Sequence, residues 1–406
     1  MQLNKLLNNN IFLAVIMILA IYLMNFHQME GAMWTGPYLS VAHNFNLSNI
    51  RLNWDEIEHF AHLPKEEMFN YNFHYEDSQI SNNYAYFSFA FIIFLVTKIF
   101  FFLGDLEAII ISQAIIHIII SLLIINKLKY NYEKLIFFLL YAINPVILYF
   151  VNFPFYYFWQ CIVSAIFVYY YITKKRFNNY IFLITIIFVI IFLARPTVLF
   201  LILFFYIIYG YRENWKKALV SIILFFCIIS IAPKSDKNTG VPWHTVFEGL
   251  GAYANTYSIE IYDAYAYKFF TKNTGKTFNN YKVEDAKTYS EYIDTLKKGY
   301  LKILREDPIL IIRNAILNIL SSYSFGYKTG NDILINISII LGLIMVILLL
   351  YTKQYILFVA IGLTNISFTP YFPPIAAYMF GGYILLVLGF IGIIRFFLNK
   401  YTKGAE

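Results

Sequence analysis

Charged side chains are scarce in this chain of 406 residues, in which Asp, Glu, Lys and Arg together make up 14%. A soluble globular chain contains about 25% of them. Hydrophobic residues make up 60% of the sequence, and they recur in runs of about 20 residues, the length that crosses the hydrocarbon core of a bilayer. The shortage of charge excludes a soluble globular domain and predicts an all-α polytopic membrane protein.

Cysteine is also rare, and Cys161 and Cys227 both stand inside apolar runs. A disulfide framework and a thiolate zinc site are therefore excluded, and we expect both side chains to pack in the core or against lipid. The chain has no internal repeat and no Gly/Ser- or Pro-rich linker, which predicts one integral membrane domain over residues 1–406. No small-residue cleavage site follows the first apolar run, 10–26, so we interpret that run as a retained span.

Acidic residues are nearly absent outside two segments. Residues 27–85 and 233–332 hold 19 of the 24 Asp and Glu residues and six of the seven histidines. Because hydrocarbon excludes charge, titratable groups gather where the chain meets water. We therefore expect two large extracytoplasmic loops, a first loop over 27–105 and a second loop over 233–332, each with an interfacial helix.

Most Lys and Arg residues outside these loops stand at the ends of apolar runs, and the positive-inside rule places such short basic connections in the cytoplasm. This predicts about ten transmembrane helices, with both termini cytoplasmic and both loops outside. The expected spans are 10–26, 106–126, 135–151, 156–173, 179–194, 197–210, 217–233, 333–351, 354–369 and 377–398.

Two apolar segments need a special interpretation. Residues 86–103 could span, but a crossing there would reverse every later connection, and Lys98 stands in the middle. We interpret them as a helix that lies in the outer interface or dips in and returns; an ordinary eleventh span is the alternative. We interpret residues 179–210 as a hairpin with Arg195 at its tip.

The first loop offers three candidate catalytic acids. Glu30 stands about one helical turn beyond the expected end of the first span. A carboxylate there lies where the head group of a lipid-linked substrate would be, and a solvated helix-end charge is the alternative. Glu76 and Asp77 precede the interfacial helix and could approach Glu30 from the other end of the loop. The histidines of this loop show no metal-ligand spacing.

The second loop begins with a stretch that is rich in glycine, aromatic residues and amides. This composition suits stacking on sugar faces and hydrogen bonding to hydroxyls, and packing of the loop on helix ends is the alternative. The candidate substrate-binding residues are Trp243, His244, Asn255 and Asp263. After residue 283, apolar residues recur at three- and four-residue steps, which predicts a helix.

Three arginines are candidate contacts for a lipid phosphate, because a guanidinium forks onto phosphate oxygens. Arg195 stands inside the apolar run FLARPTVLF, where an arginine is costly unless it is paired or wetted, so we expect it to be functional. Arg305 and Arg313 flank the Asp307-Pro308 pair that begins a second amphipathic stretch. Snorkelling at the interface is the alternative for these two.

The order of these features resembles the GT-C superfamily, polytopic glycosyltransferases that take sugars from polyprenyl-phosphate carriers and include mannosyl- and aminoarabinose transferases. The resemblance covers most of the chain. It rests on Glu30 followed by Tyr38 and Ala42, and on a first outer loop that ends in a helix such as 86–103. It also rests on the NPVILYFVNFPFYYFW block, the ARPT hairpin, the PWHTVFEGLGAYANTY loop and FTPYFPPIAAYMFGGY before the last span.

The resemblance implies a catalytic role for Glu30, because the first-loop acid of that family acts as base or metal contact, and it implies substrate contact for Tyr38. The family often has Asp-x-Asp, whereas here Gln28 stands two residues before Glu30, so a need for a divalent metal stays open. In the implied mechanism, Glu30 removes the proton of an acceptor hydroxyl that attacks the sugar. Arg195 and an outer-loop arginine stabilise the departing phosphate.

We therefore predict an enzyme of the bacterial inner membrane that moves a sugar from a polyprenyl-phosphate donor to an envelope glycan or lipid acceptor. A composition rich in Phe, Ile, Asn, Lys and Tyr is typical of an AT-rich bacterial genome. The expected partners are membrane lipid, donor and acceptor, with no nucleic acid. The absence of a large soluble C-terminal domain argues against protein N-glycosylation.

Two alternatives remain for the function. A lipid-linked glycan polymerase or ligase would share the large outer loop and the membrane arginines. A lipid-linked oligosaccharide flippase or transporter would be expected to show repeat symmetry and charges spread through many helices.

Overall fold

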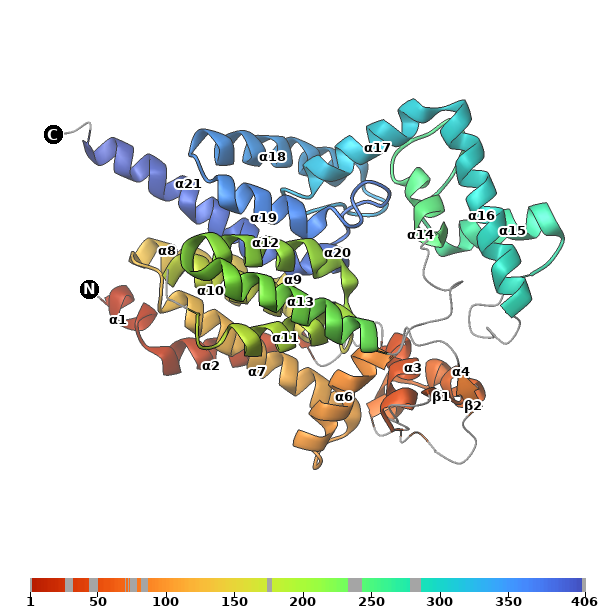
Figure 1. Cartoon of the computed structure of the whole chain (residues 1–406), viewed down its shortest axis with the longest axis horizontal. Helices are drawn as coiled ribbons and strands as arrows, with labels where there is room; N and C mark the ends of the chain where they lie inside the picture. Colours follow the sequence, from red (N-terminus) through yellow and green to blue (C-terminus); the bar gives the residue numbers. More distant parts are fainter. Residues whose placement is uncertain are drawn as a thin grey trace. The chain divides into compact units, whose positions relative to one another are not determined.

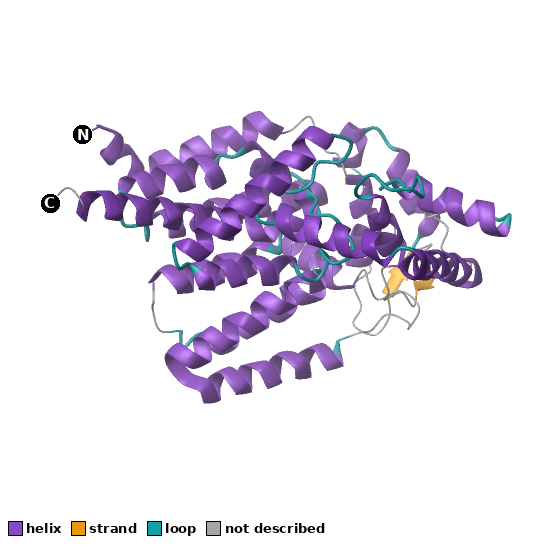
Figure 2. Ribbon diagram, turned by 90° about the horizontal axis from the view of Figure 1, so that it is seen from above, coloured by secondary structure: helices purple, strands orange, loops and turns teal. Residues whose placement is uncertain are grey.

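The computed structural model describes residues 2–25, 32–43, 50–69, 71, 73, 79–81, 87–173, 177–232, 243–277 and 286–403. Within these ranges the chain is almost entirely helical (Figure 2). The exception is a small antiparallel sheet of two strands, β1 (Ile50–Leu52) and β2 (Gln79–Ser81), in which Arg51 pairs with Ile80. The helical class predicted from the sequence is therefore confirmed, with this sheet as an addition.

The chain forms two compact units. Unit 1 comprises Met1–Lys234, Leu349–Thr364 and Phe380–Glu406, and unit 2 comprises Ser235–Leu348 and Asn365–Met379. Unit 2 therefore contains nearly all of the second loop together with most of an apolar helix that follows it.

The α-helices of unit 1 pack against one another (Figure 1). They are α1 (Gln2–Leu7), α2 (Asn10–Asn25), α3 (Ala32–His43), α4 (Trp54–His62), α5 (Lys65–Phe69), α6 (Phe87–Ile99), α7 (Asp105–Ile125), α8 (Asn131–Phe137), α9 (Pro145–Val151), α10 (Cys161–Thr173), α11 (Ile181–Ala194), α12 (Leu199–Tyr209), α13 (Trp215–Ile231), α19 (Tyr355–Asn365) and α21 (Tyr383–Lys403). The π- and 3-10 segments between them are η2 (Phe138–Ala142), η3 (Pro196–Val198), η4 (Gly210–Asn214) and η6 (Phe380–Gly382).

Unit 2 contains amphipathic helices and one long apolar helix. Its elements are α14 (Trp243–Glu248), η5 (Gly249–Gly251), α15 (Asp263–Thr274), α16 (Ala286–Glu306), α17 (Pro308–Ser321), α18 (Asp332–Tyr351) and α20 (Ala376–Met379).

Four helical segments among the described residues are long and apolar enough to cross a membrane. They are Asp105–Ile125, Pro196–Ile231, Asp332–Tyr351 and Ala376–Tyr401. A fifth crossing results if the bent pair Asn131–Ala142 and Pro145–Val151 counts as one span. The protein is thus a helical, membrane-embedded protein, as its composition predicts.

Several other expected spans correspond to shorter apolar helices, and their bounds differ from the expected ones. The expected span 135–151 is bent by 52°, because Asn144 caps α9 by accepting from the N–H of Val146 at 2.9 Å and Pro145 begins the new helix. The expected span 156–173 begins only at Cys161, and the expected span 354–369 ends its helix at Asn365.

The predicted hairpin over 179–210 is confirmed. Its two helices pack on each other through the hydroxyl of Tyr206, which donates to Thr185 Oγ1 at 2.8 Å. Arg195 ends α11 in an extended conformation (φ −147°, ψ 92°), and Pro196 begins the next turn. Proline at this position lacks an N–H and cannot continue the preceding helix.

A second turn divides the run Pro196–Ile231 into α12 and α13, which lie side by side (Figure 1). The backbone of Asn214 is extended (φ −156°, ψ 103°), and its side chain caps α13 by accepting from the N–H of Lys217 at 2.9 Å. A Cβ on Gly210 would lie 2.3 Å from the Trp215 ring, so only glycine permits this close approach. The turn falls where the sequence predicts a basic connection.

The helix expected over 86–103 is present as α6, which ends at Ile99. Its 13 residues are about 20 Å long at 1.5 Å per residue, which is shorter than a hydrocarbon core of about 30 Å. One face, with Phe89, Ile93 and Val96, is buried. This length favours an interfacial or re-entrant helix over an ordinary eleventh span.

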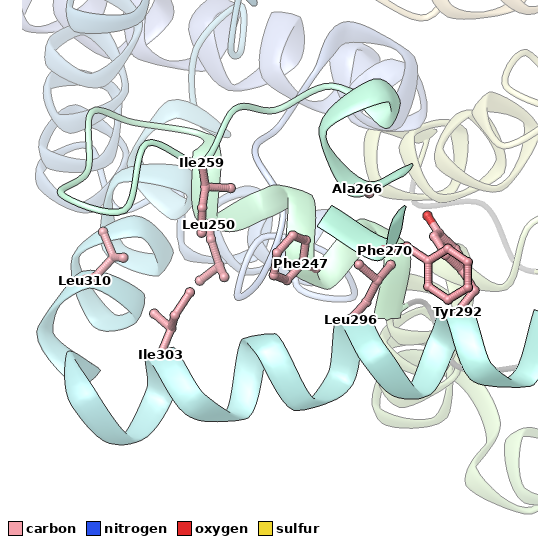
Figure 3. Close-up of a cluster of buried hydrophobic side chains, with 9 residues drawn as sticks. All are labelled: Phe247, Leu250, Ile259, Ala266, Phe270, Tyr292, Leu296, Ile303 and Leu310. Carbon is pink, nitrogen blue, oxygen red and sulfur yellow. The ribbon is translucent and has the colours of Figure 1, made fainter. Parts of the chain in front are cut away.

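The helix predicted after residue 283 is confirmed as α16, which carries much of the hydrophobic core of unit 2 (Figure 3). Tyr292 and Leu296 point from it toward Phe247 of α14 and Phe270 of α15, and Ile303 points toward Leu250. These buried rings and aliphatic side chains fix α14 and α15 on α16, which positions the polar residues that the two shorter helices carry.

Candidate functional site

The three predicted catalytic acids, Glu30, Glu76 and Asp77, lie outside the described residues. The described part of the chain instead contains three clusters of predicted substrate-binding residues, one in unit 1 and two in unit 2.

Arg195 forms the centre of the cluster in unit 1. Its guanidinium carbon lies 5.2 Å from the ring centroid of Tyr156 and 5.3 Å from that of Tyr157. A cation over an aromatic face is attracted by the negative quadrupole of the ring. The ring of Tyr38 meets Tyr156 edge-on at 5.9 Å. The structure therefore brings Arg195 and Tyr38 to the same tyrosine.

Buried hydrogen bonds hold the loop that carries Tyr156 and Tyr157. The amide of Gln113 donates to the carbonyls of Val151 at 2.8 Å and Phe153 at 2.9 Å. The hydroxyl of Thr35 donates to the carbonyl of Pro154 at 2.6 Å. Both donors are fully buried, so these hydrogen bonds fix the loop that carries the two tyrosines. In the sequence this aromatic block contributes only to the family resemblance, and the role of its two tyrosines was not predicted.

The second cluster lies in unit 2 and joins His244 and Asp263, both predicted as substrate-binding residues. His244 Nε2 lies 2.9 Å from Glu248 Oε1 and 3.2 Å from Asp263 Oδ1. Its other ring nitrogen, Nδ1, is hydrogen-bonded to the hydroxyl of Tyr292, and the ring of Tyr267 stacks on the imidazole at 5.8 Å. Glu248 is buried, whereas Asp263 is exposed.

These contacts determine the protonation of the cluster. Burial works to lower the pKa of His244, but the hydrogen bonds and charges of Asp263 and Glu248 outweigh it and raise that pKa to about 9. The hydrogen bond from His244 lowers the pKa of Asp263. Burial raises the pKa of Glu248, and the imidazole opposes this rise. At neutral pH the imidazole of His244 is therefore protonated and lies next to the ionised carboxylate of Asp263.

Glu248 and Tyr292 were not predicted from the sequence. The signal for Glu248 is its spacing: it follows His244 by four residues on α14, and residues four apart lie on one face of a helix. No local pattern indicates Tyr292, because it belongs to a helix about 50 residues further along and only packing brings it to the imidazole.

Asn255 and Arg313 line a cavity of 360 Å³ in unit 2 together with Asp307. Arg313 Nη2 donates to the carbonyl of Ala254 at 2.9 Å and to Asn314 Oδ1 at 3.1 Å. The side chain of Asn255 bonds the loop backbone on both sides, donating to the carbonyl of Ile259 at 2.9 Å and accepting from its N–H at 3.1 Å. The amide therefore organises the loop around Arg313.

The other two predicted residues of unit 2 stand apart from these clusters. Trp243 lies 5.9 Å from the ring of Tyr300, with Lys297 Nζ 5.6 Å above its indole. Arg305 is exposed near the end of α16.

A larger groove of 1190 Å³ runs between α15 and α16. Five lysines line it, namely Lys268, Lys272, Lys276, Lys298 and Lys302. Lys276 pairs with Glu291 at 2.5 Å and Lys302 with Glu306 at 3.9 Å. The other three lysines have no ion pair with any described residue. Glu291, Asp294 and Glu306 also line the groove, so its lining has an excess of two positive charges beside the rings of Tyr265 and Phe269.

The fold and these clusters define a membrane-embedded helical protein with an arginine–tyrosine cluster in one unit and a histidine–carboxylate cluster in the other. No protein-family model matches the chain, and no curated protein or solved structure matches it significantly.

Proposed function

We propose that the protein is a membrane glycosyltransferase, which moves a sugar from a polyprenyl-phosphate carrier to a glycan or lipid acceptor on the outer face of the bacterial inner membrane. The observation that supports this proposal is the Arg195 cluster. A half-buried guanidinium stands at the tip of an apolar hairpin, against Tyr156 and Tyr157. A phosphate on a lipid chain needs such a fixed cation beside an apolar surface.

The proposed chemistry is a displacement at the anomeric carbon. Glu30 takes the proton of the acceptor hydroxyl, whose oxygen forms a bond to the anomeric carbon of the sugar. The bond from that carbon to the phosphate oxygen breaks, and its electron pair leaves with the phosphate. Arg195 neutralises the charge that develops there, while Glu76 and Asp77 hold the acceptor near Glu30.

The proposal includes ten spans, with both termini in the cytoplasm and both loops outside. The turn between α12 and α13 supports this topology, because it brings Arg212, Lys216 and Lys217 to one short connection. The lysine groove of unit 2 then belongs to the outer loop, where it suits an acceptor that carries phosphate or carboxylate groups.

The test is a comparison of Arg195→Gln with Arg212→Gln. Arg212 is a matched control, because its guanidinium carbon also lies over two tyrosine rings, at 5.9 Å from Tyr170 and 5.8 Å from Tyr171. We expect wild type and Arg212→Gln to restore the envelope glycans of a deletion strain, measured by mass spectrometry. Arg195→Gln should reduce transfer by about 100-fold or more, the effect of removing one donor to a developing anion. Full restoration by Arg195→Gln would contradict the proposed role.

A further inference from the structure

Unit 2 contains a side-chain cluster that the proposed reaction does not use. His244 and Glu248 lie on one face of α14, and Asp263 begins α15. Their ligand atoms all lie within 4.8 Å of one another. We propose that His244, Glu248 and Asp263 bind a divalent metal ion of the zinc class.

The spacing of the ligand atoms fits this ion. Nitrogen and oxygen ligands about 2.0–2.1 Å from a tetrahedral zinc ion lie about 3.3 Å from each other. Nε2 of His244 lies 2.9 Å from Glu248 Oε1 and 3.2 Å from Asp263 Oδ1. The third distance, between the carboxylate oxygens of Glu248 and Asp263, is within 4.8 Å, so one ion can contact all three side chains.

The surroundings of His244 also fit a metal ligand. Tyr292 is hydrogen-bonded to Nδ1, which leaves Nε2 to face the two carboxylates. Metal-binding histidines almost always use their second nitrogen in this way, because the outer hydrogen bond fixes the ring and its tautomer. Tyr292 is only 2% exposed and belongs to the core of unit 2, so it is a rigid support.

Glu248 provides an independent indication that a ligand is needed. The residue is 5% exposed, and its Oε1 lies 2.9 Å from His244 Nε2 in a geometry that is not a well-aligned hydrogen bond. A buried carboxylate oxygen without a donor is costly. A metal ion that displaces the proton of Nε2 to solvent and binds Nε2, Oε1 and Asp263 would remove this cost and balance the two negative charges.

The donor set selects the class of ion. One imidazole and two carboxylates suit zinc or a neighbouring transition ion, whereas magnesium and calcium prefer oxygen ligands alone. The Asp263 side chain is 68% exposed, so the site opens to solvent on that side. Three protein ligands with an open fourth position are the arrangement of zinc sites that bind water or a substrate group.

The test uses the full-length protein in detergent after removal of metal with a chelator. Zinc and magnesium are titrated separately by calorimetry, and bound metal is counted by mass spectrometry. We expect one zinc ion per chain, a higher melting temperature with zinc, and much weaker binding of magnesium. Glu248→Gln and Asp263→Asn should each weaken zinc binding by about 100-fold, and Tyr292→Phe by about 10-fold.

The matched control is Glu260→Gln, because Glu260 is an exposed acid of the same unit; it should bind zinc like the wild type. Asp263 is exposed, so its variant should fold even if Glu248→Gln does not. Equal zinc binding by wild type, Asp263→Asn and Glu260→Gln would contradict the proposed metal site. The cluster would then be only an ion pair between the His244 imidazolium and a carboxylate. Arg195→Gln should keep full zinc binding, so failure of the metal site and failure of the transferase proposal are distinguishable.

Discussion

The guanidinium of Arg195 lies over the ring faces of two tyrosines, and its backbone ends α11. Tyr156 contacts both Arg195 and Tyr38, so one aromatic side chain connects two predicted substrate residues. A ring that supports a cation contributes about 0.5–2 kcal/mol, most when the pair is desolvated. We therefore propose that Tyr156 positions Arg195 for its proposed contact with a phosphate.

The role of Tyr156 predicts a difference between two substitutions. Tyr156→Phe keeps the ring face, and we expect nearly wild-type transfer. Tyr156→Leu removes the ring, and we expect about a 10-fold rise in the KM for the lipid-linked donor, which corresponds to about 1.4 kcal/mol and lies within the range of a cation–π contribution. Steady-state kinetics with purified protein measures this difference. Equal kinetics for the two variants would show that the ring face does not position Arg195.

His43 at the end of α3 gives a pH-dependent contribution to the stability of unit 1. The hydrogen bond to Asp105 raises its pKa, burial opposes the rise, the charge of Glu56 adds to it and that of Lys98 lowers it. Because the folded pKa lies above the unfolded value of about 6.5, the stabilisation is complete below that value. It is lost as the pH rises through the folded pKa.

We therefore expect wild type to exceed His43→Gln in melting temperature by more at about pH 6 than at about pH 9. Thermal unfolding in detergent at the two pH values measures this difference, with His59→Gln as a control on an exposed histidine of the same unit. A difference between wild type and His43→Gln that does not change with pH would exclude an ion pair to Asp105.

At the scale of elements, an ion pair joins α8 to α21, and one of its two side chains is much more buried than the other. Arg395 Nε donates to Glu133 Oε1 at 2.5 Å, and the Glu133 side chain is 0% exposed while that of Arg395 is 43% exposed. Glu133 Oε2 also accepts from the N–H of Lys129 at 3.0 Å and that of Tyr130 at 3.3 Å. Loss of the arginine would leave a buried carboxylate, whereas loss of the acid would leave a cation that water can reach.

This asymmetry predicts that the two partners differ in their effect on stability. We expect Arg395→Leu to lower the free energy of unfolding in detergent by about 3 kcal/mol, because it strands a buried charge. Glu133→Gln should cost only about 1 kcal/mol, since the amide oxygen still accepts from the backbone. Chemical denaturation of the purified protein measures both changes, and a larger cost for Glu133→Gln would contradict this view of the pair.

The elements show which local signals predict structure. The three- and four-residue steps of apolar residues predicted α16, because an amphipathic helix buries one face. The bend at Asn144 and the late start of α10 at Cys161 were missed, because the hydropathy of both stretches is high although Asn144-Pro145 and Asn152–Pro154 interrupt them. For the site, the sequence singled out His244 and Asp263 but not Glu248, whose role depends on the fold that joins α14 to α15.

At the scale of the whole molecule, both large loops are proposed to lie on the outer side of the membrane. Single cysteines can test this in a background with Cys227→Ser, since Cys227 is exposed and Cys161 is buried. Cysteines at positions 30, 77 and 244 should react with an impermeant maleimide added to intact cells, and a cysteine at 212 should react only after permeabilisation. Labelling at 212 in intact cells would contradict the ten-span topology, and labelling that alternates between sides would favour a transporter.

Glu30 provides the most direct test of transfer chemistry. The envelope glycans of a deletion strain are compared by mass spectrometry after expression of wild type, Glu30→Gln or Glu58→Gln, a control acid of the first loop. We expect Glu30→Gln to insert and remain stable while the sugar is absent from the glycan, because no base takes the proton of the acceptor. Glu58→Gln should restore the sugar. Glycans of wild-type composition with Glu30→Gln would contradict the assignment.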